Sequence, residues 1–326
     1  MRAETRSVLS LSLGVILLTA LAGCQEDTEP IKIGISAWAG VEPAELAFRA
    51  GHYERRGVAV EMVRFSAYTD SIEAFREGRV DVDMQTFDDA IRLAAGGKKM
   101  KVVLFTDHSY GGDGIVARKD ISSVDDLRGK TVGVETGTVG HFSLLKALEK
   151  SGLREQDITI ISIPAWEIKE AFVAGEIDAG VTWEPYLTSS AEEGDGNVII
   201  TSRSYPNQIV TTMVVSDELI ATRRPAVQSI VAAYFDAVKH IEERPAEAYA
   251  MMAAAEGISP EDFGHHVEGL RYLDLMANKS AFDPARDGEL YSRGRSLSAF
   301  LASKGVIDSE PDIDHLLLGA FVQDLR

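Results

Sequence analysis

Short runs of β-branched and other apolar residues alternate with amphipathic segments from residue 31 to residue 216. The runs have strand length and predict strands at 31–37, 58–65, 80–84, 101–106, 114–118, 131–134, 158–163, 177–182, 197–201 and 208–216. The segments between them have helical periodicity and predict helices at 43–50, 69–77, 88–95, 139–151, 167–174 and 184–193. Alternation of this kind is typical of an α/β fold with largely parallel sheets.

The pattern changes after residue 216, where the chain becomes almost wholly helical. Helices are predicted at 225–243, 245–255, 260–270 and 287–304, and proline occupies the first helical position in three of them, as Pro225, Pro245 and Pro260. We expect this helical tail to pack on the α/β body rather than to form a separate domain.

Two extended segments, 113–118 and 208–216, lack a helical crossover after them, and a self-contained βαβ set lies between them at 122–205. This arrangement predicts two lobes joined by two hinge strands, with a ligand held in the cleft between the lobes. The expected limits are 31–115 and 212–326 for lobe 1 and 116–211 for lobe 2.

The N-terminal segment has the pattern of an export signal. Arg2 and Arg6 precede an apolar stretch at 8–20, which is too short to span a bilayer and ends in Leu21-Ala22-Gly23-Cys24. This quartet resembles the lipobox of bacterial lipoproteins. It predicts a signal peptide at 1–23, a lipid on Cys24, a polar tether at 24–30 and an exported chain anchored to a membrane facing the periplasm or the cell exterior. The alternative is a chance thiol in a signal peptide without lipid.

Charge and residue usage narrow the function class. The formal net charge of −18 argues against nucleic acid as a partner. Cys24 is the only cysteine, so we expect no disulfides in the mature chain. The histidines show no metal-ligand spacing, and no nucleophile-elbow or phosphate-binding glycine motif is present. We therefore expect no metal, no cofactor and no enzymatic activity.

All three tryptophans follow predicted strands. Ligands of α/β sheets bind beyond the carboxyl ends of the strands, where Trp38, Trp166 and Trp183 lie. Trp38 and Trp183 open a turn directly at a strand end, so we expect these two to face the cleft.

The loop after 131–134 carries Thr136, Gly137 and Thr138 and opens the next helix, with His141 one turn further. Free N–H groups at a helix start, with hydroxyls beside them, make an anion site. The alternative is an ordinary threonine cap, and the sequence leaves both interpretations open.

Other strand ends offer polar candidates. Gln85 and Thr86 follow the strand at 80–84 and are placed to reach a ligand, whereas Asp88 is expected to cap the next helix. Asp113 lies in the glycine-rich hinge entry at 109–114. It is either a turn residue or a carboxylate aimed at a cationic ligand group.

Several segments resemble the nitrate/sulfonate/taurine group of substrate-binding proteins, which includes binders of thiamine-pyrimidine precursors. They are 51–53, 78–81, 123–130, 133–138, 144–148, 174–179 and 182–186, the last reading Thr-Trp-Glu-Pro-Tyr. The resemblance implies the type II periplasmic-binding fold and a monomer that hands its solute to an ABC permease with a cytoplasmic ATPase. It also implies ligand contacts from the loop after the first strand, from 85–86, from 136–138 and from the turn at Trp183 and Glu184.

The solute class stays open at this point. The resemblance favours a sulfonate, taurine or nitrate, but the cleft loops carry Asp88, Asp113, Glu135 and Glu184 and no obvious lysine or arginine. Those acids suit an amine, guanidine or pyrimidine instead. Two alternatives to transport are a sensor receptor and an enzyme like the pyrimidine synthases, which resemble this group but depend on a cysteine-rich segment.

Overall fold

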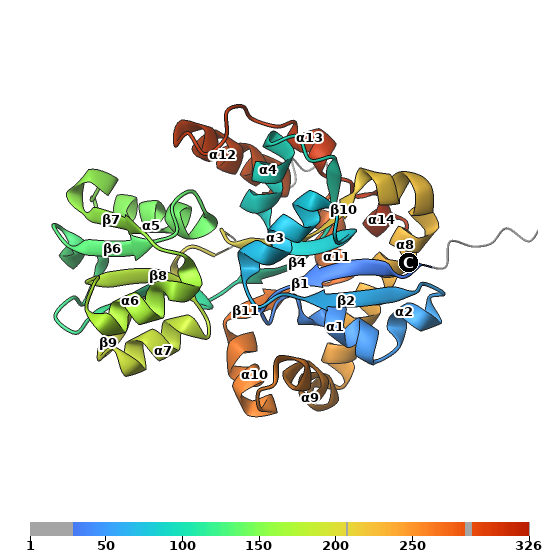
Figure 1. Ribbon diagram of the computed structural model, residues 1–326, viewed down its shortest axis with the longest axis horizontal. Coiled ribbons are helices and arrows are strands. Elements are labelled where there is room, and N and C mark those ends of the chain that lie inside the picture. Colours follow the sequence, from blue (N-terminus) through green and yellow to red (C-terminus); the bar gives the residue numbers. More distant parts are fainter. Residues whose placement is uncertain (1–28, 207, 284–288, 326) are drawn as a thin grey trace, which may run out of the picture.

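The computed structural model describes residues 29–206, 208–283 and 289–325, and it forms two lobes that each contain one β-sheet (Figure 1). The predicted signal peptide at 1–23, Cys24 and most of the tether at 24–30 lie outside the described residues. Within the described ranges, no helix is both long and apolar enough to cross a membrane.

Lobe 1 is built on a six-stranded sheet with the order β11-β4-β10-β3-β1-β2. Strand β1 pairs in parallel with β2 and β3, whereas β10 runs antiparallel between β3 and β4. The strands are β1 (Ile31–Ile35), β2 (Val60–Arg64), β3 (Val82–Thr86), β4 (Met100–Ser109), β10 (Val210–Ser216) and β11 (Leu270–Tyr272). The helices before the first crossing are α1 (Glu42–Arg49), α2 (His52–Arg55), α3 (Tyr68–Glu77) and α4 (Phe87–Ala95).

Lobe 2 is built on a five-stranded sheet with the order β7-β6-β8-β5-β9. Its strands are β5 (Asp113–Arg118), β6 (Thr131–Val134), β7 (Thr159–Ser162), β8 (Ala179–Trp183) and β9 (Gly196–Thr201). Its α-helices are α5 (Val139–Lys150), α6 (Ile168–Ala174) and α7 (Tyr186–Glu193). Short 3-10 turns occur at η1 (Val124–Leu127), η2 (Glu155–Asp157), η3 (Ala165–Glu167) and η4 (Ser202–Ser204).

The C-terminal tail packs on lobe 1, as expected, through contacts of α8 with α1 and of α13 and α14 with β4. Its helices are α8 (Asp217–Glu243), α9 (Pro245–Glu256), α10 (Pro260–Glu268), α11 (Leu275–Ala281), α12 (Glu289–Ser303), α13 (Ile313–Leu316) and α14 (Ala320–Gln323). Together with the two sheets, this tail confirms the predicted fold class.

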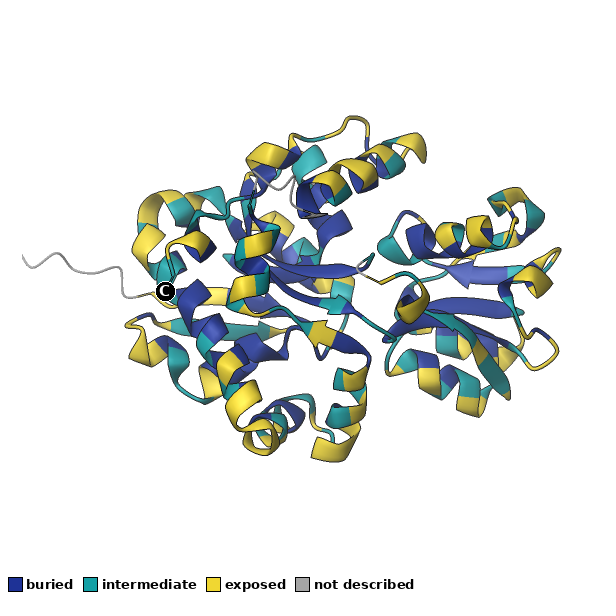
Figure 2. Cartoon of the chain, turned by 180° about the vertical axis from the view of Figure 1, so that it is seen from behind, coloured by how far each residue is buried: buried dark blue, intermediate teal, exposed yellow. Residues whose placement is uncertain are grey.

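Each lobe has its own core. Figure 2 shows buried strands at the centre of both lobes, with exposed positions on the outer helices. The larger core surrounds the lobe 1 sheet and includes Phe75, Phe105, Tyr234 and Phe321, all fully buried. Lobe 2 has two smaller apolar clusters, one with α5 residues such as Leu144 and one with α6 residues.

The chain crosses between the sheets at 110–112 and at 202–209. The two crossings are bonded to each other, since Ser109 Oγ lies 2.8 Å from Ser202 Oγ and the Gly111 N–H donates to Ser202 Oγ at 2.6 Å. Strands β5 and β10 each begin after a crossing, so the predicted hinge strands belong to one sheet each, and the second crossing contains the 3-10 turn η4. The predicted lobe limits stay predictions.

The tail also reaches lobe 2 beside helix α5. Phe300 of α12 stacks edge-on against Phe142, with ring centroids 4.8 Å apart. Lys304, just after α12, forms an ion pair with Glu155, and Val306 lies against Gly137. A third contact between the lobes therefore accompanies the two chain crossings.

Candidate functional site

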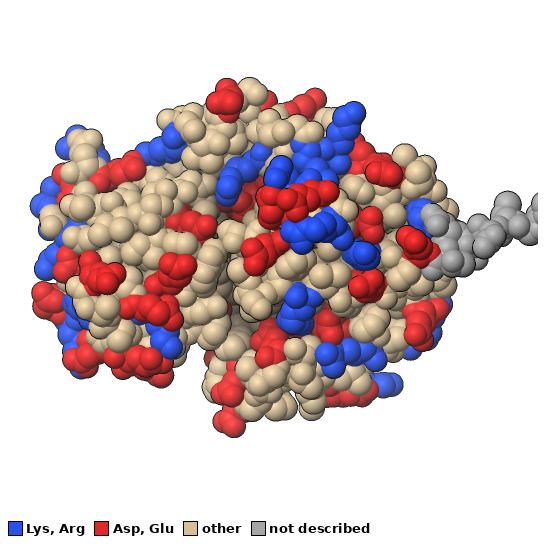
Figure 3. Space-filling view, viewed as in Figure 1, with Lys and Arg blue, Asp and Glu red and all other residues tan. Residues whose placement is uncertain are grey.

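A cavity of about 880 Å³, including its open mouth, lies between the lobes. Residues from both sheets line it, near the carboxyl ends of β1, β3, β6 and β8 and the start of β5. In Figure 3 a furrow separates the two lobes on one face of the molecule.

Trp38 forms one wall of the cavity, and two groups hold it in place. Its Nε1–H donates to Asp107 Oδ1 at 3.1 Å, and burial raises the pKa of Asp107 to about 6. Gly112 lies directly against the ring, because a Cβ there would stand 2.8 Å from Trp38 Cη2. The hinge backbone thus approaches the indole as closely as only glycine permits.

Trp183 forms a wall from lobe 2, at the end of β8. Its ring packs edge-on against Tyr68 of lobe 1, with centroids 6.2 Å apart, and against Tyr186, with centroids 6.3 Å apart. Edge-to-face packing at such distances is favourable for aromatic rings. The Tyr68–Trp183 pair therefore connects the lobes across the cavity.

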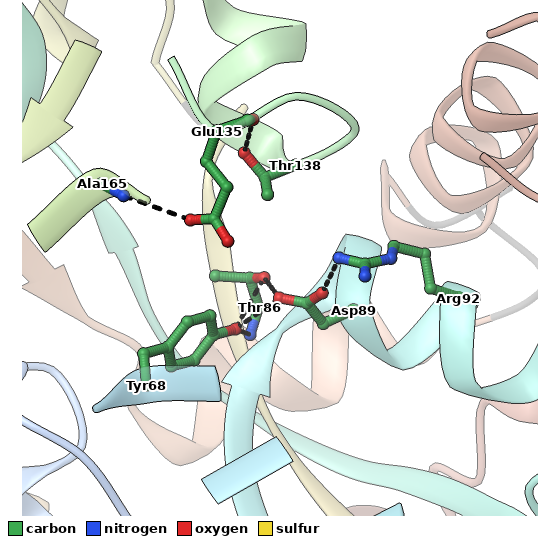
Figure 4. A network of polar contacts seen from close by, with 7 residues as sticks. All are labelled: Tyr68, Thr86, Asp89, Arg92, Glu135, Thr138 and Ala165. Atoms are coloured by element: carbon green, nitrogen blue, oxygen red, sulfur yellow. Dashed lines mark hydrogen bonds and ion pairs between the residues drawn. The ribbon is translucent and has the colours of Figure 1, made fainter. Parts of the chain in front are cut away.

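A polar network at the start of α4 forms the lobe 1 side of the cavity (Figure 4). Asp89 Oδ2 accepts hydrogen bonds from Tyr68 Oη at 2.6 Å and from Thr86 Oγ1 at 2.9 Å. Arg92 donates to Asp89 Oδ1 at 2.5 Å. Both carboxylate oxygens of Asp89 are therefore satisfied within lobe 1.

Glu135 faces this network from lobe 2 (Figure 4). Its Oε2 accepts from the Ala165 N–H at 3.3 Å, while its Oε1 points toward Thr86 and makes none of the contacts drawn in Figure 4. Burial raises the pKa of Glu135, and the charge of Asp89 adds to this effect, whereas Arg92 opposes it. The carboxylate is held by one weak bond on its own lobe.

Asp113 lies at the base of the cavity, at the first residue of β5. Its side chain is 9% exposed, and its Oδ2 has no hydrogen-bond partner among the described residues. Burial raises the pKa of Asp113 to about 7, helped by the charges of Asp107 and Glu184 and opposed by a hydrogen bond from Ser109. A buried carboxylate oxygen without a donor is unfavourable and needs a physical reason.

Five of the side chains predicted to contact ligand line the cavity, namely Trp38, Thr86, Asp113, Thr138 and Trp183. The other five, Gln85, Thr136, Gly137, His141 and Glu184, do not line it. Ligand contact by all ten residues stays a prediction.

Strand geometry explains the position of Gln85. Successive side chains of a strand point to opposite faces. Met84 and Thr86 face the cavity, so Gln85 faces the other side of the sheet, where it is fully buried and its amide atoms have no partner among the described residues.

Asp88 is not the helix cap that the sequence suggested: Thr86 is the N-cap residue of α4, and Asp88 is buried in its first turn.

Local contacts explain the other positions. The Thr136 hydroxyl lies 2.8 Å from Ser162 Oγ on the surface, and Glu184 accepts from Thr188 at the start of α7. The Gly137 N–H donates to His141 Nδ1 at 3.2 Å, and His141 Nε2 lies 3.3 Å from Glu155 Oε1. This side of the loop faces α12 instead of the cavity.

Tyr68, Asp89 and Tyr205 also line the cavity, although the sequence pattern predicts no role for them. Tyr68 begins α3 after strand β2, so the strand-end rule that selected Trp38 could also have found it. Asp89 is adjacent to Asp88 in the sequence, and composition does not show which of two neighbouring acids faces the cavity.

The start of α5 offers backbone donors to the cavity. Val139 and Gly140 line it, and the first N–H bonded within the helix is that of Phe142, to Thr138 O at 3.0 Å. The Thr138 hydroxyl does not cap the helix and donates to Glu135 O at 2.8 Å. Unbonded N–H groups at a helix start attract negative groups.

The ionisable groups of the cavity are acidic. Apart from tyrosines, the described residues that line it carry the carboxyl groups of Asp89, Asp113 and Glu135 and no Lys, Arg or His. In the described part of the chain, no group of three or more His, Cys, Asp or Glu side chains could hold a metal ion. The described lining thus combines aromatic rings, carboxyl groups and the backbone N–H groups at the start of α5.

Comparison with known proteins identifies relatives of this fold. Residues 24–256 match the model of the NMT1-like family. A candidate binding protein of Brucella abortus is 27% identical over 70% of this chain and 72% of its own length. The taurine-binding periplasmic protein of Escherichia coli is 23% identical over 81% of this chain and 85% of its own.

Solved structures agree with these relatives. The alkanesulfonate-binding protein of Xanthomonas axonopodis pv. citri, bound to MOPS, superimposes with a TM-score of 0.72 at 18% identity, covering 89% of this chain and 98% of the other. A desulfurization enzyme also superimposes, with a TM-score of 0.68 at 15% identity, covering 91% of this chain and 98% of its own. At these identities the structural matches establish the fold.

Proposed function

Because the chain belongs to the NMT1-like family, we propose that it is the substrate-binding component of an ABC importer and captures a small polar solute between its lobes. The observation that carries this proposal is a cavity lined by both lobes, with Tyr68 of one lobe packed against Trp183 of the other. A solute bound there contacts both lobes at once, which favours the closed arrangement over an open one.

The relatives suggest the first candidates for the solute. Proteins similar to this chain are named for taurine, aliphatic sulfonates and nitrate. An anionic group of such a solute would meet the free N–H groups of Val139 and Gly140 at the start of α5. The cavity has room for a molecule larger than nitrate, which favours an organic solute.

Capture without chemistry is the simpler function for this site. The curated relatives quoted above are named as binding proteins, and the chain has no cysteine after Cys24. The likeness to a desulfurization enzyme keeps catalysis on this fold as the second candidate. Conversion of a bound sulfinate or sulfonate by the purified protein would favour it.

Delivery to a membrane transporter follows from the proposed capture. We propose a monomer held by a lipid on Cys24, from which residues 25–30 act as a tether to lobe 1. Two or more acyl chains on one cysteine bind a membrane far more firmly than a single chain. The partners would be an ABC permease and its cytoplasmic ATPase.

A thermal-shift panel tests solute capture. The probes are taurine, alkanesulfonates, nitrate, aminopyrimidines, guanidine and polyamines, applied to residues 24–326 carrying Cys24→Ser. A solute at 100 times its Kd stabilises the folded state by about 2.7 kcal/mol, which raises Tm by roughly 4 °C in a chain of this size. If neither this panel nor a broad metabolite library raises Tm, the proposed function is wrong.

A further inference from the structure

The chemistry of the solute follows from two carboxyl groups that line the cavity: Asp113 has one oxygen without a donor among the described residues, and Glu135 is held by one bond of 3.3 Å. We infer that the cavity recognises its solute through a cationic nitrogen (an ammonium, amidinium or guanidinium group) placed between Asp113 and Glu135. This inference rests on the proposed function, because it names the chemical class of the captured solute. It extends to zwitterions, but it excludes anions that carry no nitrogen donor.

The balance of charge around the cavity is the first step. Its described lining has three carboxyl groups and no basic side chain. Arg92 lies beside this lining, where its guanidinium is bonded to Asp89 and is 41% exposed. Its charge also acts on Glu135, whose pKa it lowers against the effects of burial and of Asp89, whereas no basic side chain of the described lining offsets Asp113.

Asp113 supplies the strongest requirement. It is more than nine-tenths buried, it lines the cavity, and its Oδ2 has no donor among the described residues. The ionisable groups that act on it or that it acts on are Asp107, Glu184 and Tyr205, none of them basic, and Ser109 supplies a hydrogen bond to it. A solute N–H group would supply the missing donor, and a positive charge would hold Asp113 ionised.

Glu135 supplies the second partner from the same lobe, directly after β6. Its Oε1 projects into the space in front of Thr86 (Figure 4). Asp113 begins β5 and Glu135 follows β6, and strand β8 lies between these two strands in the lobe 2 sheet. A cationic solute that bonds to both carboxylates would be held by lobe 2, and its contacts with Trp38 and Tyr68 would reach lobe 1.

The walls suit the body of such a solute. Trp38 and Trp183 line the cavity, and aromatic faces attract cations that have lost their water. The backbone N–H groups at the start of α5 would donate to an anionic end of the same molecule, as in an amino sulfonate. A sulfonate without nitrogen would instead bring its charge beside two carboxyl groups and no basic side chain of the described lining.

Titration calorimetry on matched pairs of probes tests the inference. The pairs are taurine with ethanesulfonate, benzamidine with benzoate, and agmatine with pentanoate. We expect at least one nitrogen-bearing member to bind at least tenfold more tightly than its nitrogen-free partner. Equal or tighter binding by the nitrogen-free anions overturns the inference.

Substitutions locate the recognised charge. Asp113→Asn and Glu135→Gln keep the side-chain shapes and are each expected to weaken the nitrogen-bearing probe at least tenfold. Glu176→Gln removes an exposed charge outside the cavity and is expected to leave affinity unchanged. If Asp113→Asn fails to fold, Glu135→Gln at the half-buried position decides the outcome.

The outcomes separate this inference from the proposed function. Binding of ethanesulfonate or another nitrogen-free anion, unaffected by Glu135→Gln, overturns the inference but leaves solute capture intact. If no nitrogen compound binds while other metabolites raise Tm, the inference is overturned and solute capture again stands. If no compound of any kind binds, both the inference and the proposed function are contradicted.

Discussion

Buried carboxyl groups occur at several positions of lobe 1, and they differ in which donors reach them. Asp83 is fully buried on β3, where Ser71 Oγ donates to its Oδ1 at 2.5 Å and its Oδ2 has no partner among the described residues. Burial raises the pKa of Asp83 to about 8. Unlike Asp113, it does not line the cavity, so its effect is on stability alone.

Asp83→Asn is expected to stabilise the protein at neutral and alkaline pH. The folded state keeps Asp83 protonated up to about pH 8, whereas the unfolded chain loses this proton near its ordinary pKa of 3.8. Wild-type stability therefore falls as pH rises from about 4 to 8, with a limiting slope of about 1.4 kcal/mol per pH unit.

Urea unfolding at pH 5 and pH 8 measures this effect. The advantage of the Asn variant should be larger at pH 8 by about 1 kcal/mol or more. An advantage that is the same at both values would mean that Asp83 is ionised in the folded protein. Asp70→Asn, at an exposed position of α3, serves as the control.

Asp113 gives solute binding a pH dependence of its own. Its pKa of about 7 in the free protein means that it is largely neutral at pH 6 and largely ionised at pH 8. Agmatine keeps its charges over this range, so its affinity should rise by about tenfold between these pH values as Asp113 ionises. Asp107, with a pKa of about 6, would add to the rise at its lower end.

Calorimetry of agmatine binding at several pH values measures this rise. The Asp113→Asn variant should show a flatter profile, because the group that titrates near pH 7 is gone. A profile that falls with increasing pH would contradict the role of Asp113. A profile unchanged in the variant would do the same.

Single residues of the site were predictable only where a simple rule applies. The strand-end rule placed Trp38 and Trp183 correctly beside the cavity. The rule does not distinguish neighbouring residues of one strand. Thr86 faces the cavity, whereas Gln85, one position earlier on β3, is buried on the other face of the sheet. It also did not show that His141 faces helix α12, because that contact joins residues far apart in the sequence.

The contact between the end of α12 and lobe 2 is a feature at the scale of elements. Lys304 pairs with Glu155, and Phe300 packs on Phe142 beside it. Both pairs join lobe 1 to lobe 2, so each would stabilise the arrangement in which the cavity is narrow. A partly exposed ion pair contributes about 0–1 kcal/mol.

Lys304→Glu is expected to loosen this arrangement, because it places two carboxylates together. The probe is the distance between dyes on exposed sites of the two lobes, measured by single-molecule fluorescence transfer. We expect a larger mean distance in Lys304→Glu and in Glu155→Lys, with recovery in the double variant that exchanges the charges. No change in either single variant would show that this contact does not restrain the lobes.

The elements themselves were largely predictable, since hydrophobic periodicity determines both their existence and their type. Strand β6 matches its predicted limits at Thr131–Val134. Strand β11 was missed, because residue 270 lies in a segment predicted as helix. In the structure this residue begins a short strand that pairs with the long strand β4 at the edge of the sheet. Helix α8 begins earlier than predicted and bends at Arg223, two residues before Pro225.

At the scale of the whole molecule, both tryptophan walls should matter for binding more than for folding. Trp38→Ala and Trp183→Ala are each expected to weaken the best solute of the thermal-shift panel by tenfold or more. Both side chains are half-buried, so the loss in Tm should be modest. Trp166→Ala is the matched control, because Trp166 is also half-buried but does not line the cavity.

These variants are compared by calorimetry and by thermal unfolding without solute. Equal losses of Tm in all three variants, with no selective loss of affinity at 38 and 183, would make the two walls purely structural.

The two-lobe arrangement itself followed from the sequence, because the change of sheet is marked by strands without helical crossovers. The relative position of the lobes did not, because it depends on contacts such as Tyr68–Trp183.

Native mass spectrometry tests capture between the lobes most directly. Residues 24–326, carrying Cys24→Ser, are incubated with a filtered bacterial metabolite extract, desalted and measured intact. We predict an adduct of one small nitrogen-containing molecule per chain, lost in Trp183→Ala and retained in Trp166→Ala. A chain that carries no adduct, or one whose adduct persists in Trp183→Ala, would contradict solute capture in this cavity.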